Sequence, residues 1–155
     1  MELIFKLLIE GIFASFASLG FAMVFNVPKN TLKYCAFGGA IVYDLRTIFL
    51  TLDFGIEIST FLSSAIIGII ALYWSRKYKI PRPVYTVASI IPILPGTFAF
   101  SAMITLIDIN RYGTNPELVE LFIHNGLKSV SILFAITFGL VLPSLYFLRL
   151  NRPVI

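Results

Sequence analysis

The stretch SIIPILPGTFAFSAM, residues 89–103, contains two prolines, a glycine directly after the second, and no charged residue. In a water-exposed segment, Pro92, Pro95 and Gly96 would indicate a turn, because proline lacks the N–H that a helix needs and glycine loses the most backbone entropy on ordering. The apolar neighbours extend this stretch to the length of a membrane span. The sequence therefore predicts a transmembrane helix that is interrupted between Pro92 and Gly96.

The composition of the whole chain is that of a membrane protein. Of its 155 residues, 58% are hydrophobic and 13% are charged, which is about half the usual charged share. Uncharged stretches reach bilayer length, so a soluble core is not expected. We predict an all-α, polytopic bundle forming one integral membrane domain over residues 1–155. The five expected spans cover about residues 5–27, 34–52, 58–75, 84–107 and 129–148.

The charged residues separate onto the two sides of these spans. Connections on one side hold Lys29, Lys33, Arg76, Lys77, Lys79, Arg82, Arg149 and Arg152. The other side holds fewer cations, Lys6, Arg111 and Lys128, together with Glu2, Glu10, Asp53, Glu57, Asp108, Glu117 and Glu120. Because cytoplasmic loops carry the excess of lysine and arginine, we expect the N-terminus outside and the C-terminus in the cytoplasm.

Several functional classes find no support in the residues. The basic residues lie between apolar segments and form no stripe with stacking aromatics, so nucleic acid is not an expected partner. The single cysteine, Cys35, can build neither a disulfide framework nor a thiolate metal site. No paired histidine and carboxylate spacing and no glycine-rich phosphate loop is present. We therefore expect no enzyme activity, no metal and no cofactor.

Two ionisable residues, Asp44 and Arg46, fall near the middle of the second expected span. A charge at the bilayer centre costs roughly 2.5–3.5 kcal/mol on insertion scales, so each needs a partner, water or a function. Residues two apart do not face one another on a helix, so we do not expect these two to pair. Arg46 could bind a substrate carboxylate with its planar fork, and Asp44 could couple protons or cations or contact a substrate ammonium. The alternative is that one or both pair with another helix or subunit.

The interrupted fourth span offers further polar groups. Pro92 and Pro95 should leave the carbonyls of Ala88 and Ile91 without their helical donors. Such backbone is tolerated at membrane depth only inside protein or beside water. The helix restarting at Gly96 and Thr97 would present free N–H groups to an anionic substrate. The alternative is a simple proline kink, although a kink needs only one proline.

Two local patterns describe the remaining helices. Asn115 before Pro116 is a good helix-starting pair, and the helix it starts should run into the fifth span. Small residues recur every four positions in the first three spans and favour close helix packing. They are Ala14, Ser18 and Ala22, then Cys35 and Gly39, then Ser64 and Gly68.

These features together resemble the threonine/serine exporter family. The resemblance rests on GFAMVFNVP at 20–28, Arg46 in the second span, STF at 59–61 followed by Gly68, and IPILPG at 91–96 with Met103. It covers nearly the whole chain in the same order and fits the short five-span subunit of that family. Arg46 matches the family pattern, whereas Asp44 does not clearly match.

The resemblance implies a secondary exporter subunit in the bacterial inner membrane, with a larger membrane subunit as its partner. Its substrates would be small carboxylate-bearing metabolites, either threonine and serine or succinate-like dicarboxylates. We expect Arg46, Pro92, Pro95, Gly96 and Thr97 to bind substrate. Coupling to protons would involve Asp44 and, more weakly, Asp108. The alternatives are a membrane scaffold that does not transport, in which Arg46 and Asp44 only dock a partner, and a passive channel.

Overall fold

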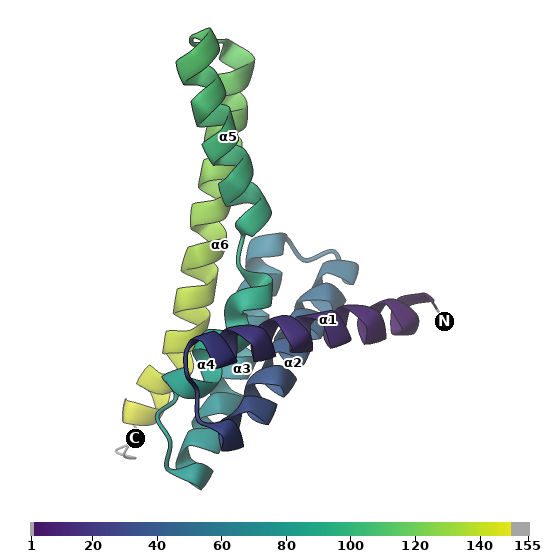
Figure 1. Ribbon diagram of the computed structural model, residues 1–155, viewed down its shortest axis with the longest axis vertical. Coiled ribbons are helices and arrows are strands. Elements are labelled where there is room, and N and C mark those ends of the chain that lie inside the picture. Colours follow the sequence, from purple (N-terminus) through teal and green to yellow (C-terminus); the bar gives the residue numbers. More distant parts are fainter. Residues whose placement is uncertain (1, 150–155) are drawn as a thin grey trace. The chain divides into compact units, whose positions relative to one another are not determined.

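The computed structural model describes the backbone of residues 2–149, and every regular element in that range is helical. This confirms the all-α class. In chain order (Figure 1) the elements are α1 (Glu2–Val24), the 3₁₀ turn η1 (Lys29–Thr31), α2 (Leu32–Thr51), α3 (Ile56–Tyr78), α4 (Pro83–Ile90), the 3₁₀ turn η2 (Ile91–Ile93), α5 (Gly96–Tyr112) and α6 (Pro116–Arg149).

The helices account for three or four membrane spans by length and composition. Leu3–Val24, Ile56–Tyr78 and Pro116–Tyr146 are each long and apolar enough, and α4, η2 and α5 together would make one interrupted span. Helix α2 is 20 residues long but is not among the candidates, and it carries Asp44 and Arg46 in its interior. The predicted total of five is therefore not confirmed and stays a prediction that depends on α2.

The predicted interruption lies where the prolines are. Helix α4 ends at Ile90, the short turn η2 follows, and α5 begins at Gly96 after Pro95. One detail of the prediction is wrong: the Ala88 carbonyl is not left free, because it accepts a hydrogen bond from the N–H of Ile91. Tightening the last turn into a 3₁₀ pattern thus replaces the donor that Pro92 lacks.

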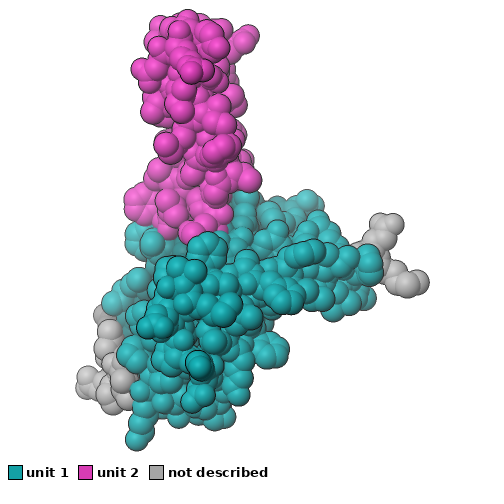
Figure 2. Space-filling view, in the orientation of Figure 1, with its two compact units in different colours: residues 1–93, 135–155 teal, residues 94–134 magenta. Residues whose placement is uncertain are grey.

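The chain divides into two compact units, which are coloured separately in Figure 2. The first unit contains residues 1–93 and 135–155, and the second contains residues 94–134. Each is described by itself below. The expected single membrane domain over 1–155 stays a prediction.

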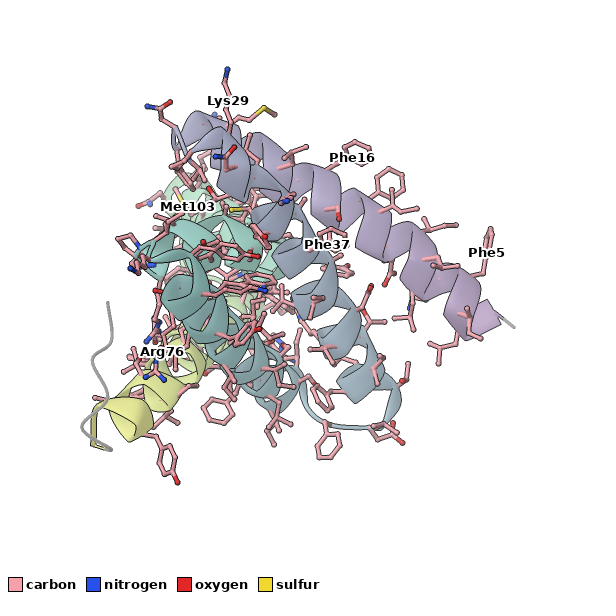
Figure 3. The ribbon with its side chains drawn as sticks, turned by 90° about the horizontal axis from the view of Figure 1, so that it is seen from below. Phe5, Phe16, Lys29, Phe37, Arg76 and Met103 are labelled. Atoms are coloured by element: carbon pink, nitrogen blue, oxygen red, sulfur yellow. The ribbon has the colours of Figure 1, made fainter. Side chains whose placement is uncertain are left out.

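Small residues hold the first unit together, as the repeats predicted. Helices α1 and α2 lie side by side as an antiparallel pair (Figure 3), with Ala14, Ser18 and Ala22 buried between them. A Cβ atom added at Gly39 would lie 2.6 Å from the Cβ of Ser18 and 3.0 Å from the carbonyl oxygen of Ala14. The two backbones approach so closely that only glycine fits there.

Helix α3 packs against the last part of α6 in the same manner. A Cβ atom at Gly139 would lie 2.7 Å from the carbonyl oxygen of Phe61 and 2.7 Å from the Cβ of Ser64, which is fully buried. The hydroxyls on this helix largely bond to their own backbone: Thr60 donates to the Ile56 carbonyl at 2.6 Å and Ser63 to the Ser59 carbonyl at 2.7 Å. Such bonds allow polar side chains to line a tight, apolar interface.

The second unit consists of α5 and the first part of α6, which Figure 1 shows as a helical hairpin. The predicted cap is confirmed, because Asn115 Oδ1 accepts a hydrogen bond from the Glu117 N–H at 3.2 Å. Buried small and polar side chains face the inside of the hairpin, and they are Ala102, Thr105, Asn125 and Ser129. Close packing of small residues therefore builds both units.

The buried thiol of Cys35 yields a direct test of the α2–α4 packing. Cys35 is fully buried, and its Sγ donates to the carbonyl oxygen of Val84 at 3.3 Å. We expect a membrane-permeant maleimide to leave Cys35 unlabelled in the native protein and to label it fully in detergent-denatured protein, because reaction needs an accessible thiolate. Mass spectrometry of the intact chain measures this, and rapid labelling of the native protein would contradict the packing.

Candidate functional site

Arg46 lies beside the interruption of the fourth predicted span. Its Nη1 donates to the carbonyl oxygen of Ile93 at 3.1 Å. Ile93 ends η2, so no continuing helix supplies the donor that this carbonyl would otherwise have. The Nε of Arg46 is buried and, within the part of the chain that the structure describes, has no hydrogen-bond partner. The guanidinium is thus tied to the break by one bond and keeps donors unused.

The Asp44 side chain contacts a different element from the one that Arg46 contacts. Its carboxylate lies against Gly11 of α1, where an added Cβ would be 2.7 Å from Oδ2 and 3.0 Å from Oδ1. Oδ1 is buried and has no hydrogen-bond partner among residues 2–149. The expectation that Asp44 and Arg46 do not pair is therefore confirmed, since one faces α1 and the other faces η2. Glycine at position 11 makes room for the carboxylate.

A third charged residue, Glu10, lies in this region, although it was not among the predicted site residues. Thr47 Oγ1 donates to Glu10 Oε2 at 3.2 Å, and Lys6 Nζ lies 3.9 Å from Glu10 Oε1. Because Gly11 touches Asp44 and Thr47 lies one turn beyond Asp44, the two carboxylates are neighbours. A signal was present in the sequence: Glu10 is an ionisable residue inside the first apolar stretch.

An open hollow lies between Glu10 and the proline break. Its volume is about 370 Å³, and its wall is made by α1, α2 and η2. The lining residues are Glu10, Phe13, Ala14, Ala17, Tyr43 and Pro92. The first unit thus brings together Arg46, Asp44 and Pro92 from the predicted site and adds Glu10 to them.

The remaining predicted site residues belong to the second unit or its start. Pro95 precedes α5, and the Gly96 N–H already donates to the Leu94 carbonyl at 2.8 Å. The Ala99 N–H donates to the Pro95 carbonyl at 2.9 Å. The candidate anion donors at this helix start are therefore the N–H groups of Thr97 and its neighbour Phe98, and their participation with Arg46 stays a prediction.

Asp108 is also in the second unit. It lies within α5, one turn before the helix ends at Tyr112, rather than at the end of the helix as the predicted span limits implied. It is therefore part of a different unit from Asp44. Its proposed coupling role stays a prediction.

The charged groups of α1 and α2 define what this region can bind. Arg46 offers a planar cation with unused donors, and Glu10 and Asp44 offer two carboxylates close together. Such a set can hold an anionic group at the arginine and a proton or cation at the carboxylates.

Long apolar helices packed around ionisable groups define a helical membrane protein with a polar region. The sequence model of the family described as "Threonine/Serine exporter, ThrE" matches residues 10–146. The chain belongs to this family, as the sequence features indicated. Membership makes it a membrane protein of a transporter family.

A relative supports the assignment and shows a difference in length. The chain is 40% identical over 150 residues to an uncharacterized protein of Haemophilus influenzae, and the match covers 97% of this chain and 50% of the relative. The chain therefore spans about half the length of that relative. No solved structure matches the chain.

Proposed function

We propose that the chain is a subunit of a secondary transporter that exports small carboxylate-bearing metabolites, and that Arg46 binds the substrate carboxylate. The observation that carries the proposal is the state of the Arg46 guanidinium. It is anchored to the Ile93 carbonyl at 3.1 Å while its buried Nε has no partner among the described residues. An arginine left incompletely bonded at the depth of a span is costly, and a carboxylate would supply the missing acceptors.

The charges nearby bear on which carboxylate substrate is bound. Glu10 and Asp44 would repel the second carboxylate of a succinate-like molecule, whereas they would attract the ammonium of threonine or serine. The nearby cation Lys6 does not offset this repulsion, because its Nζ already pairs with Glu10 Oε1 at 3.9 Å. Of the two substrate classes that we considered, these charges favour the amino acids.

The transporter would be completed by a second membrane subunit. The relative in Haemophilus influenzae is about twice as long as the region it shares with this chain, so half of that relative lies outside the shared region. We propose that a larger membrane subunit supplies that half, in the bacterial inner membrane, with the N-terminus of this chain outside and its C-terminus in the cytoplasm.

The partner is tested by purifying the tagged chain from its native membrane in mild detergent and measuring the intact masses. A larger membrane protein in equal amount, whose sequence matches the other half of the long relative, is the expected result. Recovery of the chain only as a homo-oligomer would contradict the partner and would leave the substrate proposal to be tested on that oligomer.

The transport activity is tested by efflux from cells loaded with labelled threonine, serine or succinate, with and without the two subunits. We expect saturable efflux that depends on an ion gradient and that prefers the amino acids. Efflux that does not saturate would indicate a passive channel. No change in efflux for any of the three would favour the scaffold that does not transport.

The coupling role of Asp44 makes a separate prediction. Asp44→Asn removes the ionisable oxygen beside Gly11 while keeping the size of the side chain, so efflux should lose its dependence on an imposed pH gradient. The measurement compares initial efflux rates with and without the gradient. Asp108→Asn serves as the comparison in the second unit, and an unchanged gradient dependence in both variants would remove these two residues from the coupling step.

A further inference from the structure

We propose that one end of the first unit binds an anionic phospholipid, with the phosphate headgroup at lysine and tyrosine side chains and an acyl chain in a neighbouring apolar hollow. This end is formed by the starts of α2 and α4 and the end of α3. Figure 3 views the molecule from this side. The proposal does not depend on the transport activity proposed above.

An aromatic cluster marks this end. The ring of Tyr34 lies 5.1 Å from the ring of Trp74, 5.0 Å from that of Tyr78 and 5.9 Å from that of Tyr85. The hydroxyls of Tyr34 and Tyr78 are joined by a hydrogen bond of 2.6 Å. Tyrosine and tryptophan prefer the level of the lipid headgroups, because their rings are apolar and their tips are polar. The cluster therefore indicates the headgroup level on the first unit.

Two lysine ammonium groups are held over these rings. Lys33 Nζ lies 5.3 Å from the centre of the Tyr34 ring, and Lys77 Nζ lies 5.6 Å from that of Tyr78 and 5.8 Å from that of Tyr73. Contact with an aromatic face positions a cation without neutralising it. These two ammonium groups are thus fixed in place and remain available to a phosphate.

Lysine and arginine gather at this end, with no acidic residue close to them in the sequence. Residues 11–43 and 58–107 contain no aspartate or glutamate, whereas they hold Lys29, Lys33, Arg76, Lys77, Lys79 and Arg82. The ion pair between Lys6 and Glu10 lies in α1, outside both stretches. Clusters of lysine and arginine beside a span attract anionic lipids.

A hollow of about 250 Å³ lies at the same end and is largely apolar. Its wall is formed by Phe25, Asn26, Val27, Pro28, Pro83, Val84, Val87 and Ala88. It directly adjoins the basic connections, because Pro28 precedes Lys29 and Pro83 follows Arg82. Figure 3 shows Lys29 directed away from the ribbon at this point.

The lysine side chains and the apolar hollow together favour one kind of ligand. A free phosphate would use the lysines but not the hollow, and a neutral lipid would use the hollow but leave the lysines without an anion. A phospholipid with net negative charge uses both, and it is present at the headgroup level of any bacterial inner membrane. One molecule then makes both the electrostatic contact with the lysines and the hydrophobic contact with the hollow.

The test measures the thermal midpoint of the purified chain, with any subunit that co-purifies, in a neutral detergent. Phosphatidylglycerol should raise the midpoint by about 5 °C or more, if it saturates the site. Phosphatidylcholine with the same acyl chains should raise it much less, and 0.5 M NaCl should reduce the difference because salt screens exposed charges. Equal shifts with both lipids, or the full shift with inorganic phosphate alone, would overturn the proposal.

A matched pair of variants locates the site. Lys77→Gln should remove most of the phosphatidylglycerol shift, whereas Lys128→Gln should keep it. Lys128 is also held over an aromatic ring, 5.7 Å from the centre of Phe98, but it belongs to the second unit. A full shift in the Lys77→Gln protein would overturn the assignment. If that variant does not fold, native mass spectrometry of the unaltered protein decides: retention of phosphatidylglycerol over phosphatidylcholine supports the proposal, and equal retention overturns it.

Discussion

Arg46→Lys should lower export of the carboxylate substrate at least about tenfold and leave the amount of folded complex unchanged. Lysine keeps the positive charge but loses the planar fork, so it can hold either the Ile93 carbonyl or the substrate, not both in the same geometry. A hydrogen bond to a charged group contributes roughly 1.5–3 kcal/mol, and 1.4 kcal/mol corresponds to a factor of ten. The measurement is the initial rate of efflux at a substrate concentration below saturation.

Arg82→Lys provides the matched control for this prediction. Arg82 Nη2 also donates to a backbone carbonyl, that of Leu140, at 3.1 Å. Leu140 belongs to α6, which, like the region around Pro92, contains a proline, Pro143. Arg82 is at the α3–α4 connection rather than at the Pro92 break, so its replacement should leave efflux within a factor of about two of the unaltered protein. If Arg46→Lys abolished assembly instead of efflux, Arg46 would be a docking residue. If it changed neither, Arg46 would have no part in either function.

Gly139→Val should have the largest effect on stability, lowering the free energy of unfolding by about 2–3 kcal/mol. The new Cβ would stand 2.7 Å from the Phe61 carbonyl oxygen and 2.7 Å from the Ser64 Cβ, so α6 would have to move away from α3. Overpacking of this kind typically costs about 1–3 kcal/mol, and the backbone contact leaves little room for relaxation. The thermal midpoint in detergent and the yield of monodisperse protein measure the effect.

Gly126→Val in the same helix is the control. A Cβ atom at Gly126 meets no atom within 4 Å, and valine is a better helix former than glycine. Its thermal midpoint should stay the same or rise slightly. Equal losses in the two variants would mean that the close approach of α3 and α6 is not the cause of the loss at Gly139.

Local features of the sequence determined much of the fold. The helical class follows from apolar stretches of bilayer length, since the backbone must satisfy its own hydrogen bonds in lipid. The break at Pro92 and Pro95 follows from the missing N–H groups, and the start of α6 follows from Asn115 before Pro116. Each of these depends on residues within one or two turns, which is why the sequence alone predicted them.

The span count shows where such local reasoning stops. Helix α2 has the length of a span, but Asp44 and Arg46 lie in its interior, whereas the charged residues of α3 lie near its ends. Whether a helix of this kind crosses the membrane depends on what its charges meet, and composition does not contain that information.

The candidate site was decided by tertiary structure. Arg46 reaches a carbonyl 47 positions away, and Thr47 reaches Glu10 across 37 positions. The sequence identified Arg46 and Asp44 as costly residues, but it could not show that Gly11 admits the Asp44 carboxylate or that Glu10 and Pro92 share one hollow. Those partners depend on how closely α1, α2 and η2 pack, and the close approach at Gly39 and Gly11 sets that distance. The sequence thus determined which groups require partners, and the packing of the helices determined which partners they have.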